Sequence, residues 1–125
     1  MVRLLVCDDS QAFATLVRHW VTDTADLEVV GITANIADVL SEAEVLQPDV
    51  IVIDHLLGQD TSDGLAEVLR SRAPGARVLL VSGMPADSLA AAAEACGADG
   101  HLSKSASATE FCDAIRAIAA AGDAG

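Results

Sequence analysis

Short runs of apolar residues alternate along this chain with longer segments in which apolar residues recur every three or four positions. Runs rich in Val, Ile and Leu are typical of β-strands. They predict five strands, at residues 2–7, 27–32, 49–54, 77–82 and 99–103. The middle runs show no alternation of apolar and polar residues, which indicates that both of their faces are buried in a sheet.

The segments between these runs have the period of amphipathic helices. The first helix is expected to begin after Ser10, which serves as its cap, and to place Trp20 in the core. Its apolar positions are Phe13, Leu16, Val17, Trp20 and Val21. Asn35 begins a second predicted helix that ends before Pro48, and Asp63 precedes a third.

The remaining helices carry clear signals at their ends. The apolar positions of the third helix are Leu65, Val68 and Leu69. A fourth, Ala-rich helix covers about residues 87–95 and ends at Gly97, a residue type that is common after helix ends. The sequence Ser-Ala-Thr-Glu at 107–110 forms a capping box, which predicts the start of a fifth helix.

Five strands that alternate with five helices predict an α/β fold with a doubly wound parallel sheet, because parallel neighbours need crossover connections. We expect the strand order 2-1-3-4-5 and a single domain, which the length of 125 residues permits. Ligands of such sheets bind outside the carboxyl ends of the strands, near the switch point between the first and third strands.

Polar side chains stand at this edge of the predicted sheet. Asp8 and Asp9 follow the first strand, and Asp54 ends the third. Ser82 ends the fourth strand, and Lys104 follows the fifth. Since the carboxyl ends of parallel strands meet, we expect three carboxylates, one hydroxyl and one ammonium group to converge.

Clustered carboxylates without Cys or His suit a hard dication such as Mg²⁺ (or Mn²⁺), which offsets their mutual repulsion. A carboxylate on the central strand, here Asp54, can attack phosphorus, as in other proteins that form aspartyl phosphates. Lys104 can neutralise a phosphoryl oxygen, and Ser82 can donate a hydrogen bond to another. These residues therefore predict phosphoryl transfer to Asp54.

Charge and cysteine content restrict the partners and the compartment. The chain has 7 Lys and Arg against 19 Asp and Glu, a formal charge of −12, which argues against DNA binding by this chain alone. No apolar run reaches the ~18 residues of a membrane span, and no basic leader precedes the first strand. We expect a cytoplasmic protein with no membrane contact, in which Cys7, Cys96 and Cys112 are buried reduced thiols.

Four segments carry the residues of this edge: CDD at 7–9, VIVIDHLL at 50–57, LLVSG at 79–83 and GADGHLSKS at 97–105. Together, at these spacings, they resemble the receiver domain of two-component response regulators. The resemblance covers about Arg3 to Ala121 and implies a flavodoxin-like receiver fold. It implies a receiver domain at residues 1–121, with a tail or the start of a linker at 122–125.

The resemblance implies a role for each site residue. Asp54 is the phosphoacceptor, and Lys104 binds the phosphoryl group. Mg²⁺ (or Mn²⁺) is held by Asp8, Asp9, Asp54 and the backbone carbonyl of Leu56. Ser82 is the switch hydroxyl, and His101 stands at the position of the rotating switch residue, which is usually Tyr or Phe.

The same resemblance implies a regulatory protein rather than an enzyme, beyond its own phosphorylation and dephosphorylation. A sensor histidine kinase or a phosphotransfer protein supplies the phosphoryl group. GADGHLSKS and LQPDVIVID most resemble the branch that carries a C-terminal helix-turn-helix domain, so we expect transcription as the output. The surface of the fourth helix, fifth strand and fifth helix is expected to change, and a homodimer can form there.

Three departures from the family pattern leave a second hypothesis open. The loop after the acceptor is longer than usual and has Gly58 in place of Pro, His101 replaces an aromatic residue, and Ser105 stands where many receivers have Pro. These changes permit a pseudo-receiver, a constitutive protein-interaction module without a phosphorylation switch. An assay with a phosphodonor separates the two hypotheses.

Overall fold

The computed structural model describes residues 1–54, 65–83 and 85–123. Its strands are β1 (Val2–Cys7), β2 (Leu27–Thr33), β3 (Val50–Asp54), β4 (Arg77–Ser82) and β5 (Gly100–Ser103). They form one parallel sheet in the order β2-β1-β3-β4-β5. The predicted strand order is therefore confirmed, and the predicted strand bounds are correct to within a residue.

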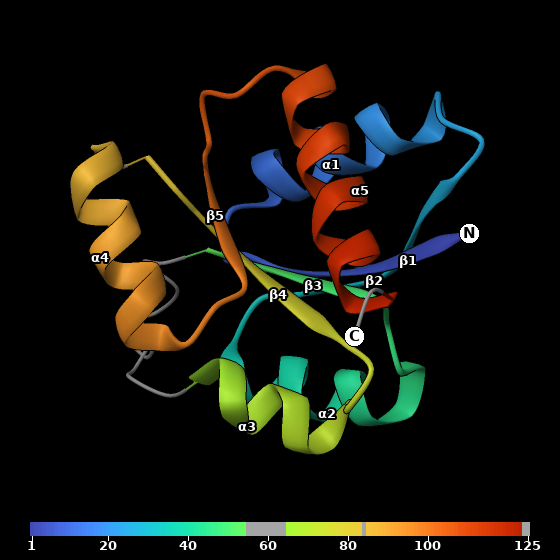
Figure 1. Ribbon diagram of the computed structural model, residues 1–125. Coiled ribbons are helices and arrows are strands. Elements are labelled where there is room, and N and C mark those ends of the chain that lie inside the picture. Colours follow the sequence, from blue (N-terminus) through green and yellow to red (C-terminus); the bar gives the residue numbers. More distant parts are fainter. Residues whose placement is uncertain (55–64, 84, 124–125) are drawn as a thin grey trace.

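The helices are α1 (Gln11–Thr22), α2 (Ile36–Leu46), α3 (Leu65–Arg72), α4 (Ala86–Cys96) and α5 (Ala108–Asp123). Figure 1 shows α1 and α5 on one face of the sheet and α2 and α3 on the other, with α4 beside β5. This arrangement is the doubly wound α/β fold that the sequence predicts. None of the helices in the described ranges has the length and apolar character needed to cross a bilayer.

The sheet separates two hydrophobic cores, so alternate residues of each central strand enter different cores. In β1 and β3 the residues that face α2, α3 and α4 are Leu5, Cys7, Ile51 and Ile53. The residues that face α1 and α5 are Leu4, Val6, Val50 and Val52. Because helices cover both faces, these strands need no polar positions, and each fully buried aliphatic side chain contributes about 1.5–3 kcal/mol.

The helix ends follow the predicted capping signals. The side chain of Asn35 accepts a hydrogen bond from the backbone N–H of Asp38 at 2.8 Å. Ser107 and Glu110 form the predicted capping box: the Ser107 hydroxyl accepts from the Glu110 N–H, and the Glu110 carboxylate accepts from the Ser107 N–H. Gly97 ends α4 in the left-handed conformation, with φ 83°. Asp63, the predicted start of α3, lies outside the described residues.

The prediction that Leu16 and Val68 lie on the buried faces of their helices is wrong. Leu16 is 40% exposed and Val68 is 44% exposed. In both helices a small residue, Ala14 in α1 and Ala66 in α3, takes the buried place instead. Each alanine follows the first buried residue of its helix and shifts the buried stripe away from position i+3. The helical pattern therefore failed here because it counted large apolar residues as buried and passed over small ones.

The start and the aromatic face of α1 also differ in detail from the prediction. Ser10 is the cap residue, but its side chain makes no capping hydrogen bond; instead its N–H donates to Oδ1 of Asp8 at 2.8 Å. Trp20 packs against the core but remains partly exposed. Its ring lies between Phe13 and Phe111, with ring centroids 6.4 Å and 5.4 Å away.

Candidate functional site

The carboxyl edge of the sheet brings together the predicted site residues because neighbouring strands end in register. Cys7 of β1 pairs with Ile53 of β3, so Asp8 and Asp54 directly follow a paired position. Ser82, the last residue of β4, pairs with Ser103, the last residue of β5, so Lys104 directly follows a paired position. The backbone N–H of Lys104 also donates to the carbonyl of Ser82 at 2.9 Å, which fixes the start of the loop after β5.

Three carboxylates form an acidic cluster at this edge. Asp8, Asp9 and Asp54 each offer an oxygen, and these oxygens lie within 4.8 Å of one another. Asp8 and Asp54 are buried, whereas Asp9 is exposed. Such a cluster concentrates negative charge at a place where two of the three carboxylates are shielded from water, so it favours a cation.

Lys104 supplies a positive charge to the cluster. Its Nζ lies 2.8 Å from Oδ2 of Asp8 and 3.3 Å from Oδ2 of Asp54. Burial lowers the pKa of Lys104, but its close contact with the Asp8 carboxylate and the charge of Asp54 outweigh that effect, so the pKa is raised overall. The side chain is therefore an ammonium ion at neutral pH and neutralises part of the acidic cluster.

The two oxygens of Asp8 have different environments. Oδ1 accepts the Ser10 N–H and so fixes the turn between β1 and α1. Oδ2 is buried and accepts no hydrogen bond of good geometry from the described residues; its contact is the ion pair with Lys104. The ion pair with Lys104 offsets part of the cost of burying this oxygen, and a metal ion would offset more of it. This oxygen and the all-carboxylate donor set fit a hard dication such as Mg²⁺.

Ser82 and His101 occupy the predicted positions on β4 and β5, but their surroundings differ. Ser82 is fully buried at the carboxyl end of β4. His101 is exposed and lines a shallow pocket of about 350 Å³ with Leu79 of β4 and Ile118 of α5. Leu56, whose carbonyl is the remaining predicted metal ligand, lies outside the described residues.

Phe13 also neighbours the site, although the sequence interpretation assigned it only to the core. Its ring lies in the first turns of α1, and Nζ of Lys104 lies over it, 4.9 Å from the ring centroid. The spacing of apolar residues predicts burial of Phe13 but not this contact. The signal for it is positional: Phe13 follows the Asp8 and Asp9 pair by about one helical turn.

The three cysteines are buried, as predicted, and none of them forms a disulfide. Burial raises the pKa of the Cys7 thiol to about 11, although a hydrogen bond with Thr33 opposes this effect. Cys7 is therefore protonated at neutral pH and does not compete with the carboxylates for a metal ion.

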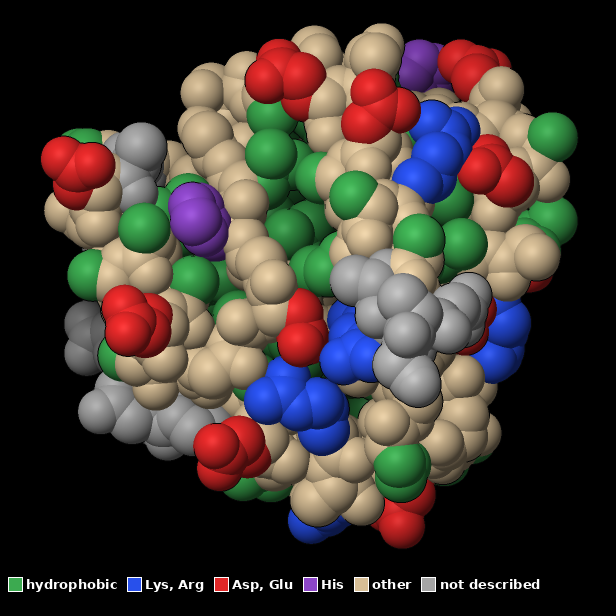
Figure 2. Space-filling view, in the orientation of Figure 1, with side chains coloured by type: hydrophobic (Ala, Val, Ile, Leu, Met, Phe, Trp, Pro, Cys, Tyr) green, Lys and Arg blue, Asp and Glu red, His purple; other side chains and the backbone are tan. Residues whose placement is uncertain are grey.

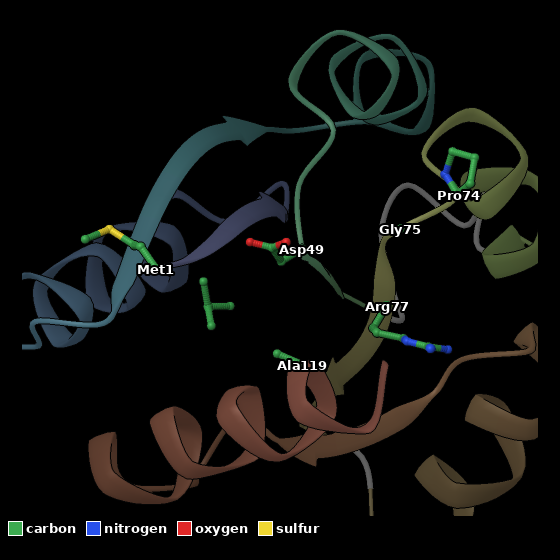
Figure 3. A pocket seen from close by; sticks show the side chains of 7 residues that line it. Met1, Asp49, Pro74, Gly75, Arg77 and Ala119 are labelled. Carbon is green, nitrogen blue, oxygen red and sulfur yellow. The ribbon is translucent and has the colours of Figure 1, made fainter. Parts of the chain in front are cut away.

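Other charged groups and pockets lie away from the acidic cluster. Figure 2 shows Lys and Arg side chains low on this face and again near its upper right, in both places beside acidic side chains. Arg70 and Arg77 both form ion pairs with Asp99, so part of the basic charge is neutralised locally. A pocket of about 400 Å³ opens at the opposite, amino edge of the sheet, between Asp49, Arg77 and Ala119 (Figure 3). The acidic cluster is thus a separate site.

Comparisons with known proteins all find response regulators. The family model described as the response regulator receiver domain matches residues 4–116. The response regulator protein VraR of Staphylococcus aureus is 27% identical over 117 residues, which cover 92% of this chain and 55% of VraR. The chain thus spans about half the length of the curated relatives it matches.

Solved structures give the same result at the level of the fold. The signal receiver domain of the response regulator NarL from Mycobacterium tuberculosis is 30% identical, with a TM-score of 0.83 over 94% of this chain and 95% of that one. A response regulator from Burkholderia pseudomallei, solved with a phosphorylated aspartic acid, a calcium ion and citrate, is 27% identical. Its TM-score is 0.79, and the match covers 99% of this chain and 72% of that one.

Proposed function

The chain belongs to the response regulator receiver domain family, and from this premise we propose that it is a phosphorylation-controlled switch. Asp54 receives a phosphoryl group from a phosphohistidine of a sensor histidine kinase or a phosphotransfer protein. The convergence of Asp8, Asp9 and Asp54 around the ammonium of Lys104 carries the proposal. The Burkholderia relative, which holds a phosphorylated aspartic acid and a calcium ion, supports it.

The acidic cluster is the proposed site for Mg²⁺ (or Mn²⁺). Asp8, Asp9 and Asp54 provide carboxylate oxygens, and the backbone carbonyl of Leu56 is the fourth proposed ligand. The bound ion would neutralise the developing negative charge of the phosphoryl group. The buried Oδ2 of Asp8 is the strongest support in this chain for such an ion.

The residues of the chain position and stabilise the group that is transferred. A carboxylate oxygen of Asp54 forms a bond to phosphorus, while the bond from phosphorus to the histidine nitrogen of the donor breaks. The released imidazole retains the electron pair of that bond and takes up a proton. Lys104 pairs with one phosphoryl oxygen, and the hydroxyl of Ser82 donates to another.

Phosphorylation is proposed to change the surface of α4, β5 and α5. As Ser82 and Lys104 engage the phosphoryl oxygens, His101 moves inward from its exposed position, and the equilibrium between two surface states shifts. This surface can form a homodimer or receive an output partner. The expected output is transcription, through a domain outside this chain, and we expect a cytoplasmic regulator with no other enzymatic activity.

Intact-mass measurement tests the central proposal. Incubation with acetyl phosphate or phosphoramidate and Mg²⁺ should add one phosphoryl group per chain, and Asp54→Asn should prevent the addition. Label that persists in Asp54→Asn would show that another residue is the acceptor. An unlabelled wild type with both donors and with a histidine kinase would instead favour the pseudo-receiver, a constitutive interaction module.

A further inference from the structure

A contact between Phe13 and Lys104 joins the hydrophobic core to the acidic cluster. Nζ of Lys104 lies over the Phe13 ring, 4.9 Å from its centroid. Phe13 belongs to α1, whereas Lys104 belongs to the loop between β5 and α5. We propose that Phe13 is a positioning residue, which holds the ammonium of Lys104 where it meets the phosphoryl group. The inference rests on the proposed function, in which Lys104 binds that group.

The physical basis is the attraction between a cation and the negative face of an aromatic ring. Such contacts are significant within about 6 Å of the centroid, and they strengthen when water is excluded. Phe13 is 8% exposed, and the side chain of Lys104 is 25% exposed. The contact is therefore largely shielded from solvent.

The ring gives Lys104 a contact that does not depend on the carboxylates. In this structure the ammonium also pairs with Asp8 and Asp54. When these carboxylates bind a dication or a phosphoryl group, their attraction for Lys104 weakens or is redirected. The ring of Phe13 carries no net charge and offers no oxygen to a metal ion, so its contact with the ammonium persists.

Phe13 belongs to a row of three aromatic rings, of which it is the one beside Lys104. Trp20 meets the Phe13 ring edge-on, with an angle of 87° between the planes, and Phe111 packs on Trp20 at 5.4 Å. Phe111 is buried in the same core but has no cation–π contact with Lys104 among the described residues. Phe111 is therefore a matched control for the loss of an aromatic core residue.

The first test measures the rate of Asp54 phosphorylation by phosphoramidate with saturating Mg²⁺. Phe13→Leu should slow the reaction by about two- to tenfold. Phe13→Tyr keeps the ring and should restore a rate close to that of wild type, while Phe111→Leu should leave the rate unchanged. In a Lys104→Met background, Phe13→Leu should have no further effect, because its partner is absent.

The second test needs neither metal nor phosphoryl transfer. Urea unfolding in chelator, with single and double variants, measures the energetic coupling between two side chains. Coupling should be present between Phe13 and Lys104 and absent between Phe111 and Lys104. If Phe13→Leu does not fold, Phe13→Met takes its place, because Met fills a similar volume without a ring face.

The outcomes separate the inference from the proposed function. A wild type that no donor labels overturns both. If Lys104→Met slows phosphorylation but Phe13→Leu does not, the positioning role is wrong and the proposed function stands. Equal slowing by Phe13→Leu and Phe111→Leu would likewise show that a loss of core packing, rather than the ring face, controls the rate.

Discussion

The ammonium of Lys104 lies closer to Oδ2 of Asp8, at 2.8 Å, than to Oδ2 of Asp54, at 3.3 Å. The cation is thus shared between a proposed metal ligand and the proposed phosphoacceptor. Oδ2 of Asp8 is also the buried oxygen that accepts no hydrogen bond of good geometry from the described residues. Lys104 and a dication therefore compete for the same oxygen, which makes Lys104 important for both stability and metal affinity.

Lys104→Met is expected to weaken the protein without metal and to strengthen its binding of Mg²⁺. Removal of the ammonium leaves Asp8 and Asp54 as buried charges without this partner, which should lower the free energy of unfolding in chelator by about 1–3 kcal/mol. Loss of the competing cation should raise the affinity for Mg²⁺ roughly fivefold. Urea unfolding and calorimetric titration measure the two effects.

Arg72→Met is the matched control for this prediction. Arg72 also pairs with a carboxylate, that of Glu44 at 3.6 Å, but both side chains are largely exposed. Its removal should change the free energy of unfolding by less than about 1 kcal/mol and leave the Mg²⁺ affinity unchanged. Weaker Mg²⁺ binding by Lys104→Met than by wild type would contradict the competition.

Asp26 and Arg116 should produce a pH-dependent contribution to stability far from the site. The Arg116 guanidinium donates to both oxygens of Asp26, at 2.7 and 3.0 Å, and lowers the pKa of Asp26 from its ordinary 3.8. As pH falls, Asp26 is protonated in the unfolded chain before it is protonated in the folded protein. The stabilisation is therefore present above pH 3.8 and is lost as pH falls through the lower pKa of the folded state.

Asp26→Asn tests this contribution through urea unfolding at several pH values between about 5 and 2.5. The variant should lose stability less steeply than wild type below pH 4, and Arg116→Met should flatten the curve in the same way. Because the pair is exposed, 1 M salt should reduce the difference. Identical slopes for Asp26→Asn and wild type at low salt would show that the pair does not contribute.

The acidic cluster could be predicted because topology determines it. Asp8, Asp54 and Ser82 stand at the ends of runs that are too apolar to be anything but central strands, and parallel strands bring such ends together. The position of Lys104 beside the cluster could be predicted in the same way, because it follows the last strand. Neither the folding of the intervening helices nor their exact bounds had to be known.

Contacts between side chains of different elements could not be predicted in this way. The cation–π contact of Lys104 with Phe13 depends on the rotation of α1 about its axis, and the apolar pattern misassigned that rotation when it placed Leu16 in the core. The hydrogen bond from the Ser10 N–H to Asp8 similarly depends on the geometry of the turn between β1 and α1. Small buried residues such as Ala14 carry this information, and hydrophobic periodicity weights them too little.

The three thiols should resist modification in the native protein. Cys7, Cys96 and Cys112 are all buried, and burial raises the pKa of Cys7 to about 11. The reactive species is the thiolate, so both exclusion and protonation slow the reaction. With DTNB at pH 8, labelling should proceed no faster than unfolding, and three thiols should react at once in denaturant. Rapid labelling of one thiol in the native protein would contradict the buried positions.

Asp9→Asn is expected to raise the stability of the metal-free protein. Asp9 contributes a charge to the acidic cluster but is exposed, and Lys104 pairs with Asp8 and Asp54 instead. Its repulsion of the two buried carboxylates is present in the folded state and relieved when the chain unfolds. Asn is similar in shape, so the change should increase the free energy of unfolding in chelator by about 0.5–1 kcal/mol.

In Mg²⁺, wild type should become more stable than Asp9→Asn, the reverse of the order in chelator, because a ligand stabilises the state that binds it. Millimolar Mg²⁺ should raise the Tm of wild type and have little effect on Asp9→Asn, which lacks one ligand charge. Four thermal melts at neutral pH, with chelator or Mg²⁺ for each protein, measure both effects. Asp23→Asn removes an exposed carboxylate outside the cluster and should respond to Mg²⁺ as wild type does. If Mg²⁺ stabilises Asp9→Asn as much as wild type, Asp9 is not a metal ligand, and the charge repulsion at the end of β1 needs another explanation.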